Sequence, residues 1–222
     1  MSFVAAATGL LAEARIVAAP GVRAVSCGGR ADMLAEKLRC AIADGASAIL
    51  SFGIAGGLHP ELNPGDIVVA SAVVTPDGRV LEANPVWRET IAAALAPAVR
   101  VGRLAGVAVA VASIHGKSAL HTRTDALAAD MESHVAAQIA TDHGLPFAAL
   151  RAVADPAARA LPAAALVGLR ADGSSDVAAV LRELARSPAE LPALIRVALD
   201  TRAALRALAH CQRLASAQLA QA

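Results

Sequence analysis

"AILSFGIAGGLHPELNPGDIVVASAVVT", residues 48–75, contains two short apolar runs separated by glycine, proline and polar residues. The runs Ala48–Ile54 and Asp66–Thr75 are rich in Val, Ile and Ala and are bounded by Gly, Pro or Asp, a pattern typical of strands that are covered on both faces. The same pattern predicts further strands over Phe3–Thr8, Val107–Ile114 and Phe147–Ala154.

Segments with helical periodicity alternate with these strands. Ala31–Asp44 and Met131–His143 place apolar residues four positions apart, and Gly45 and Gly144 follow as residues that can end a helix. From about residue 176 to 219, Leu and Ala recur at helical spacing, interrupted by prolines, which predicts two closing helices after a loop over 170–176. Alternating strands and helices predict a layered α/β domain, and without an internal repeat or linker we expect one domain over residues 1–222.

The composition limits the classes of function. The 222 residues carry a formal net charge of +1 and only 2% aromatic residues. This leaves neither a basic field for phosphate backbones nor a stacking platform for single strands, so we expect no nucleic-acid partner. The three widely spaced cysteines are typical of reduced thiols in a cytoplasmic protein.

The apolar N-terminus, "MSFVAAATGLLAEARIVAAP", raises the question of a signal peptide. It has no basic start, and Glu13 and Arg15 interrupt it, so we interpret its beginning as a first strand. The run Leu104–Ile114 is far shorter than the roughly 20 residues of a membrane span, which favours a soluble protein without stable membrane insertion.

Several kinds of chemistry lack their motifs. The six histidines form neither H-x-H nor H-E-x-x-H, which argues against a metal site. No G-x-S-x-G is present for acyl transfer. The glycines of "SFGIAGGLHP" match neither the dinucleotide fingerprint nor the P-loop; they form either a tight turn or a backbone that lies close to a ligand.

Four features fall where the strands of an open α/β sheet end, which is where such sheets bind ligands. They are Gly9 with Glu13, the glycine-rich stretch, the sequence Asp130-Met131-Glu132, and Asp155. The alternative for "DME" is that its acidic residues merely complement the dipole of a first helical turn, with Asp130 as an N-cap. On a helix, residues two apart point in roughly opposite directions, so we expect at most one of the two carboxylates in "DME" to face a site.

Asp155 ends a predicted strand, and Pro156 fixes its backbone as extended. Arg151 lies four residues earlier, about 13 Å away along a strand, which is too far for a close ion pair. An unpaired, buried Asp keeps its proton, because raising its pKa from about 3.9 to near 7 takes roughly 4 kcal/mol, within what desolvation supplies. Asp155 is therefore a candidate general acid, the alternative being a capping or turn residue.

Three stretches together resemble the nucleoside phosphorylase and nucleosidase superfamily: "SFGIAGGLHPELNPGDIVVAS", "ADMES" and "LPFAALRAVAD". The likeness runs from the first strand to about Asp155. Within the superfamily, "DMESH", "CGGR" and "LRAVADPAARALP" most resemble the hopanoid-associated phosphorylases.

The resemblance implies a three-layer α/β/α fold with a mixed central sheet. It implies cleavage of the N-ribosyl bond of a purine (adenine) nucleoside by phosphorolysis, with adenosylhopane of hopanoid biosynthesis as a candidate substrate that carries a large apolar 5′ group. It also implies a cytoplasmic homo-oligomer that needs no cofactor, with phosphate as a possible co-substrate.

The resemblance also assigns roles to individual residues. Asp155 would protonate or hydrogen-bond the purine N7, and general acid help of this kind is worth about 10²–10⁴-fold. Glu132 would bind the ribose hydroxyls, Met131 would line the sugar pocket, and Glu13 would activate water. A phosphate or water site would include Gly9, Arg30 and Arg151, and the backbone near the ligand would be that of Gly53, Ile54, Ala55 and Gly56.

Three positions depart from the family pattern. Ile54 stands where Ser or Thr is usual, Ser51 stands where many phosphorylases have a phosphate-binding Arg, and "IHGK" replaces the usual aromatic over the base. Two alternatives to phosphorolysis therefore stay open. One is a hydrolytic nucleosidase in which Glu13 activates water, and the other is a nucleoside-binding protein that has lost catalysis.

Overall fold

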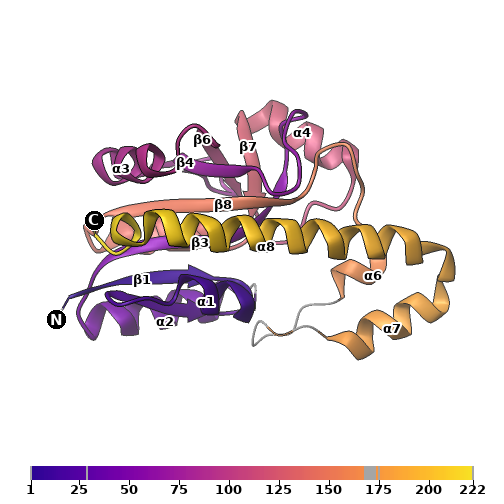
Figure 1. Ribbon diagram of the computed structural model, residues 1–222, viewed down its shortest axis with the longest axis horizontal. Coiled ribbons are helices and arrows are strands. Elements are labelled where there is room, and N and C mark those ends of the chain that lie inside the picture. The colour runs from indigo at the N-terminus through magenta and orange to yellow at the C-terminus, as the bar shows by residue number, and fades with distance from the viewer. Residues whose placement is uncertain (1, 29, 168–173, 175, 222) are drawn as a thin grey trace.

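The computed structural model describes residues 2–28, 30–167, 174 and 176–221 (Figure 1). Its strands are β1 (Phe3–Thr8), β2 (Val22–Ser26), β3 (Ala46–Gly57), β4 (Ile67–Val74), β5 (Val80–Glu82), β6 (Val99–Gly106), β7 (Ala126–Asp130) and β8 (Phe147–Asp155). Its helices are α1 (Leu11–Val17), α2 (Ala31–Ala43), α3 (Pro85–Leu95), α4 (Ile114–Thr124), α5 (Ser133–Asp142), α6 (Ala163–Leu166), α7 (Val177–Arg186), the 3₁₀ turn η1 (Pro188–Glu190) and α8 (Leu191–Leu219).

Within the described residues the eight strands form one mixed sheet, in the order β2-β1-β3-β7-β6-β4-β5. β8 pairs with both β3 and β4, in parallel with β3 and antiparallel to β4. The strands β3, β7, β6, β4 and β8 therefore close into a ring. Outside this ring, β1 pairs with β3, and β2 pairs with β1. The predicted α/β fold with a mixed sheet is confirmed, and the closed ring brings the ends of β3, β7 and β8 close together.

Helices cover the sheet on two faces, because successive residues of a strand point to opposite sides. Val4 and Ala6 of β1 pack in the cluster that contains α3 and α8, whereas Ala5 and Ala7 pack in the cluster that contains α2 and α5. Figure 1 shows α8 lying along β8. Small alanine side chains on both faces allow the helices to approach the sheet closely.

The strand predicted over Val107–Ile114 is wrong. The strand in this region is β6, Val99–Gly106, and it is followed by a loop that leads into α4. The first five residues of β6 are exposed or half-buried and include Arg100 and Arg103, so the strand lacks the continuous apolar run on which the prediction depended. The apolar residues after Gly106 belong instead to the loop, and some of them line the cavity described below.

The helices predicted over Ala31–Asp44 and Met131–His143 correspond to α2 and α5, although α5 begins two residues later, at Ser133. Gly45 and Gly144 follow these helices with φ values of 103° and 63°, as expected for helix-ending glycines. The closing helices are α7 and α8, and the loop predicted over 170–176 lies mostly outside the described residues.

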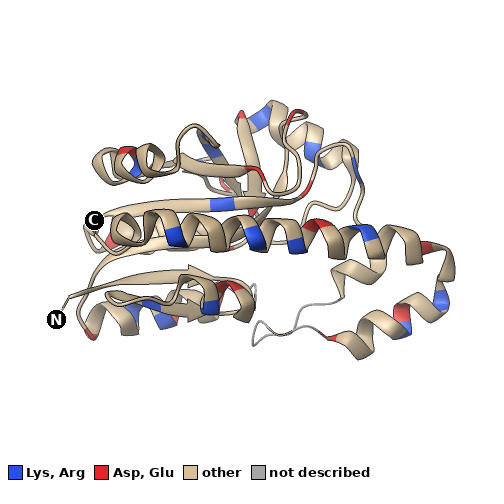
Figure 2. Cartoon of the chain, viewed as in Figure 1, with Lys and Arg blue, Asp and Glu red and all other residues tan. Residues whose placement is uncertain are grey.

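No helix of the described residues combines the length and the apolar character needed to cross a membrane. Basic and acidic side chains are interspersed over the elements (Figure 2). The most strongly buried charges are concentrated at one place, the ends of β3, β7 and β8.

Candidate active site

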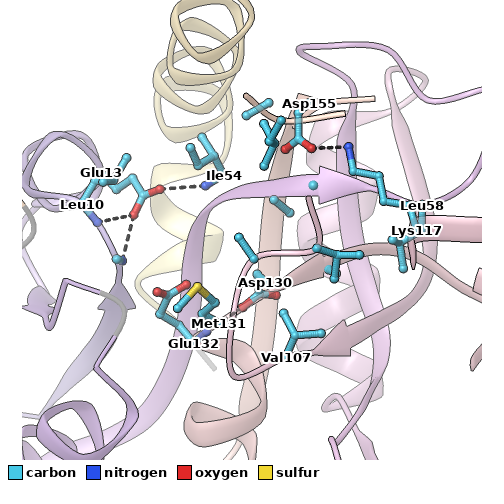
Figure 3. A pocket seen from close by; sticks show the side chains of 18 residues that line it. Leu10, Glu13, Ile54, Leu58, Val107, Lys117, Asp130, Met131, Glu132 and Asp155 are labelled. Carbon is cyan, nitrogen blue, oxygen red and sulfur yellow. Dashed lines mark hydrogen bonds and ion pairs between the residues drawn. The ribbon is translucent and has the colours of Figure 1, made fainter. Parts of the chain in front are cut away.

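A cavity of about 200 Å³ lies where β1, β3, β7 and β8 end, the location expected for a ligand site in an α/β fold (Figure 3). Its walls combine apolar side chains with a few carboxylates and one lysine. The lining residues are Gly9, Leu10, Glu13, Ile54, Ala55, Gly56, Leu58, Val107, Ala110, Val111, Lys117, Ala129, Asp130, Met131, Glu132, Ala154, Asp155 and Leu161.

Glu13, in the first turn of α1, reaches one side of this cavity and is 1% exposed. Its Oε2 accepts hydrogen bonds from the backbone N–H groups of Gly9 (2.9 Å) and Leu10 (2.8 Å), and its Oε1 accepts one from the N–H of Ile54 (2.8 Å). Burial raises the pKa of Glu13, although nearby Arg151 and these three donors oppose the effect. The carboxyl group is thus fixed in position, and its raised pKa makes the carboxylate a stronger base, as suits a general base.

Arg151 of β8 is fully buried beneath the cavity and does not line it. Its Nη2 lies 2.9 Å from Asp130 Oδ1 and 3.5 Å from Glu132 Oε2, and it donates to the Ser51 hydroxyl at 2.6 Å. The Ser133 hydroxyl and the Ile54 carbonyl lie near its other nitrogens, each at 3.4 Å. The guanidinium is therefore engaged by the protein itself, and its predicted place beside an incoming phosphate or water is not where the structure puts it.

The expectation that at most one carboxylate of "DME" faces a site is wrong. Asp130 ends β7 and Glu132 precedes the first residue of α5, so the two do not lie on a helix. Both line the cavity and both pair with Arg151. Asp130 also caps α5, because its Oδ1 accepts from the N–H groups of Glu132 (2.9 Å) and Ser133 (2.6 Å). The capping alternative and the site interpretation therefore both apply to Asp130.

Glu132 lies beside Met131 in the cavity wall (Figure 3). Desolvation, with the negative charges of Asp130 and Glu13, raises the pKa of Glu132 to about 8, against the effect of Arg151. Near pH 8, both the ionised and the protonated forms of this carboxyl group are present. The ionised form accepts a hydrogen bond from a hydroxyl group, and the protonated form can donate one.

Glycines let this carboxylate cluster assemble. A Cβ on Gly9 would lie 2.7 Å from Glu132 Oε1, and a Cβ on Gly53 would lie 2.6 Å from Arg151 Nη1 and 2.7 Å from the Glu13 carboxyl carbon. Gly53 therefore packs behind the site instead of lining it. Ile54, Ala55 and Gly56 do line the cavity, as strand residues of β3.

Asp155, at the end of β8, is not unpaired as predicted from the sequence. Lys117 of α4 forms an ion pair with its Oδ2, although Arg151 makes no contact with it, in agreement with their spacing along the strand. Burial raises the pKa of Asp155, and the Lys117 ammonium opposes that effect. The Asp155 side chain keeps 15% exposure toward the cavity, where Gly56 lies beside Oδ1.

Lys117 is the site residue that sequence reasoning missed. It is fully buried, lines the cavity, and belongs to "IHGK", the stretch noted only for lacking an aromatic. A lysine one turn into a helix gives no sign of its partner from sequence alone, because 38 residues separate it from Asp155.

Arg30 lies away from the cavity. Its side chain is 49% exposed and pairs with Asp32 at 2.7 Å, at the start of α2. Its pKa is raised by that pairing. Its predicted contact with phosphate therefore has no support in this geometry.

In this part of the described chain, carboxylates outnumber basic groups. Four acidic side chains gather around the cavity: Glu13, Asp130, Glu132 and Asp155. The basic partners that the structure gives them are Arg151 and Lys117. Such a site is electrostatically suited to a ligand in which positive charge develops, and poorly suited to an added anion.

Solved structures share this fold. Native futalosine hydrolase of Helicobacter pylori superposes with a TM-score of 0.72 at 14% identity, covering 98% of this chain and 97% of that one. The 5′-methylthioadenosine/S-adenosylhomocysteine nucleosidase of Helicobacter pylori, complexed with butyl-thio-DADMe-Immucillin-A, gives 0.67 at 15% identity over 96% and 98%. The S. pneumoniae nucleosidase of that name, with a transition-state inhibitor, gives 0.66 at 16% over 96% and 99%.

A search of curated protein sequences gave no significant match. A family model described as the phosphorylase superfamily matches residues 6–195, which include every residue that lines the cavity. This agrees with the resemblance of the three sequence stretches at the level of the superfamily. Because the match spans well over half of the chain, the chain belongs to the phosphorylase superfamily.

Proposed function

We propose that this protein cleaves the N-ribosyl bond of an adenine nucleoside with water as the acceptor. The observation that carries the proposal is the placement of Glu13 and Asp155. Glu13 accepts a hydrogen bond from the N–H of Ile54, and Asp155 lies beside Gly56. Ile54 and Gly56 are two residues apart on β3, about 7 Å along a strand. Both carboxyl groups line the cavity. The proposal is also supported by the solved structures of similar fold, which are named as a nucleosidase and a futalosine hydrolase.

Each carboxyl group has a task in this reaction. When the bond between the sugar and the base breaks, its electron pair goes to the purine and the sugar becomes oxocarbenium-like. A proton supplied at N7 from Asp155 neutralises the leaving purine, while Glu13 takes a proton from the water that attacks the sugar. Glu132 and Met131 lie on the wall near Glu13, where Glu132 can hydrogen-bond the ribose hydroxyls.

Hydrolysis has better support than the phosphorolysis implied by the sequence resemblance. A phosphate would need a basic partner, yet the donors of Arg151 are taken by the protein, and Arg30 does not line the cavity and is paired with Asp32. Any of the carboxyl groups around Glu13 that is ionised would also repel a phosphate dianion.

The 5′ group of the substrate is a finer part of the proposal. The cavity wall is rich in apolar side chains, among them Leu10, Ile54, Val111 and Leu161. This composition is compatible with the large apolar 5′ group implied by the resemblance to hopanoid-associated phosphorylases. Faster cleavage of adenosine analogues with long 5′-alkylthio chains than of adenosine would support it, and equal rates would count against it.

The experiment that tests the main proposal measures adenine release by chromatography from adenosine and from 5′-methylthioadenosine, each with and without phosphate. We expect adenine in both conditions at the same rate. Release that requires phosphate would favour phosphorolysis. No release from either nucleoside, together with measurable binding by calorimetry, would favour a binding protein that has lost catalysis.

A further inference from the structure

The side chain of Lys117 ends in a cage of oxygen atoms. Its Nζ donates to Asp155 Oδ2, to the Pro156 carbonyl at 3.0 Å and to the Arg159 carbonyl at 2.9 Å. The lysine is 0% exposed, and the two carbonyls come from the segment that directly follows β8. The segment after the candidate acid thus folds back over the lysine.

The cage indicates which protonation state it holds. A lysine ammonium has three N–H donors and no acceptor, which matches three oxygen acceptors. A neutral amine has only two N–H groups, so its lone pair would face one of the oxygens. The geometry therefore favours charged Lys117, with ionised Asp155 as its partner. A carboxylate held in this way has no proton of its own to give.

We propose that Lys117 and Asp155 share one exchangeable proton, which rests on Lys117 in the empty site and passes to the leaving purine during cleavage. Asp155 is the group that touches the base, and Lys117 is a positioning residue that supplies the proton through it. This inference rests on the proposed nucleoside cleavage, and it replaces the unpaired, protonated Asp155 expected from the sequence.

The protons balance over the cycle. As the bond between the sugar and the base breaks, the pair loses one proton to purine N7 and becomes neutral Lys117 with ionised Asp155. Water adds to the sugar and gives one proton to Glu13. The pair then takes up one proton from solvent while Glu13 releases one, so that nucleoside and water become free base and free sugar.

Other charged groups near the pair form a separate contact. Arg159 Nη1 and Asp200 Oδ2 of α8 are 2.5 Å apart, and both lie close enough to Asp155 to influence its pKa, in opposite directions. Lys117 has a larger effect on the pKa of Asp155 than either of them, because it acts both through its charge and through a hydrogen bond.

Magnetic resonance can observe the proton directly, because the sequence contains only two lysines, Lys37 and Lys117. With ¹⁵N at lysine Nζ and ¹³C at aspartate Cγ, the variants Lys37→Met and Asp155→Asn assign the signals. At pH 7 we expect the Lys117 nitrogen to be an ammonium and Asp155 to be ionised. In Lys117→Met we expect the pKa of Asp155 to rise by about one unit or more, since an opposite charge has been removed. A protonated Asp155 in the wild type, or an unchanged pKa in the variant, would overturn the inference.

The pH profile of kcat/KM supplies a second readout that a purely structural role would not move. Without Lys117, only a protonated Asp155 can supply the proton. We therefore expect kcat/KM of Lys117→Met to be about a hundredfold below that of the wild type at pH 8, which is the scale of a missing general acid. Near pH 5, we expect most of this difference from the wild type to disappear. An equal loss at every pH would contradict the inference. The exposed Lys37→Met is the matched control and should follow the wild type.

Lys117→Gln, which keeps hydrogen-bond donors but has no charge, serves if Lys117→Met does not fold, and the same alkaline loss and acidic recovery are expected. The two experiments also separate this inference from the proposed function. If the wild type releases no adenine but the resonance data show the expected ionisation, the proposed function fails and the control of Asp155 by Lys117 stands. If adenine is released but Asp155 is protonated at rest, the proposed function stands and the control of Asp155 by Lys117 fails.

Discussion

The two ends of the cavity hold their charges in different ways. Around Glu13, three carboxylates share the single guanidinium of Arg151, which lies beneath the cavity. At Asp155, one carboxylate meets one ammonium inside a cage of carbonyl groups. The first end has an acidic excess, whereas the second is balanced.

This difference matches the two halves of the proposed reaction. An acidic excess stabilises the positive charge that develops on a sugar, and the raised pKa of Glu13 makes its carboxylate a stronger base. A balanced pair can store one proton for a leaving base. Removing a group at one end should therefore give a different kinetic signature from removing a group at the other.

The largest effect is expected at the acidic end. Glu13→Gln removes the proposed base, so kcat should fall about a thousandfold while nucleoside binding, measured by calorimetry, is retained. Glu36→Gln, an exposed change on α2, is the matched control. If the Glu13 variant kept most of its turnover, water activation would have to be assigned elsewhere.

The balanced end should respond less strongly but in its own way. We expect Asp155→Asn to lower kcat at least about a hundredfold with little change in thermal unfolding, since general acid help is worth 10²–10⁴-fold. Asp142→Asn on the exposed end of α5 controls for the chemistry of the substitution. Adenine release close to the wild-type rate would remove Asp155 from the reaction.

Glu132→Gln tests the sugar contact and the electrostatics together. Measured above pH 8, where the Glu132 carboxyl is ionised, loss of one charged hydrogen bond should raise KM and lower kcat, reducing kcat/KM by about thirtyfold. Because burial raises the pKa of Glu132 from 4.5 to about 8, the wild type should lose stability as pH rises from 4.5 through 8. The free energy of unfolding of the variant should fall less over this range, as urea titrations at several pH values would reveal. Parallel pH dependences in the variant, the wild type and the exposed control Glu89→Gln would contradict the raised pKa.

The smallest effect is expected from Gly9→Ala, because the added Cβ would lie 2.7 Å from Glu132 Oε1 and must displace that side chain. We expect KM to rise severalfold. In a double-mutant cycle with Glu132→Ala, which removes the side chain that the added Cβ would meet, the effect should be weaker than in the wild type. Additive effects would place the strain elsewhere.

Motif residues could be placed from the sequence because they occur in short, ordered stretches. Gly9, Glu13, Glu132 and Asp155 all line one cavity, as expected for residues at strand ends. Gly9 directly follows β1 and Asp155 ends β8, and both strands are buried along nearly their whole length in continuous apolar runs, which made them predictable. The roles of these residues stay predictions.

The pairing of charges could not be predicted, since it depends on distances across the fold. Lys117 comes from a helix, and its partner comes from a strand 38 residues later. The sequence spacing predicts opposite faces of a helix for Asp130 and Glu132, which is wrong because β7 ends at Asp130 and α5 begins only at Ser133. A shift of two residues in a helix start thus reversed the conclusion about which carboxylates share the site.

The division of tasks between the two ends is tested most directly by following the sugar product. With excess phosphate present, ³¹P resonance spectra recorded during adenine release should show inorganic phosphate alone, and the sugar should accumulate as the free pentose. A sugar 1-phosphate signal that grows in step with adenine would show that phosphate enters beside Glu13, and would contradict the role of that residue in activating water.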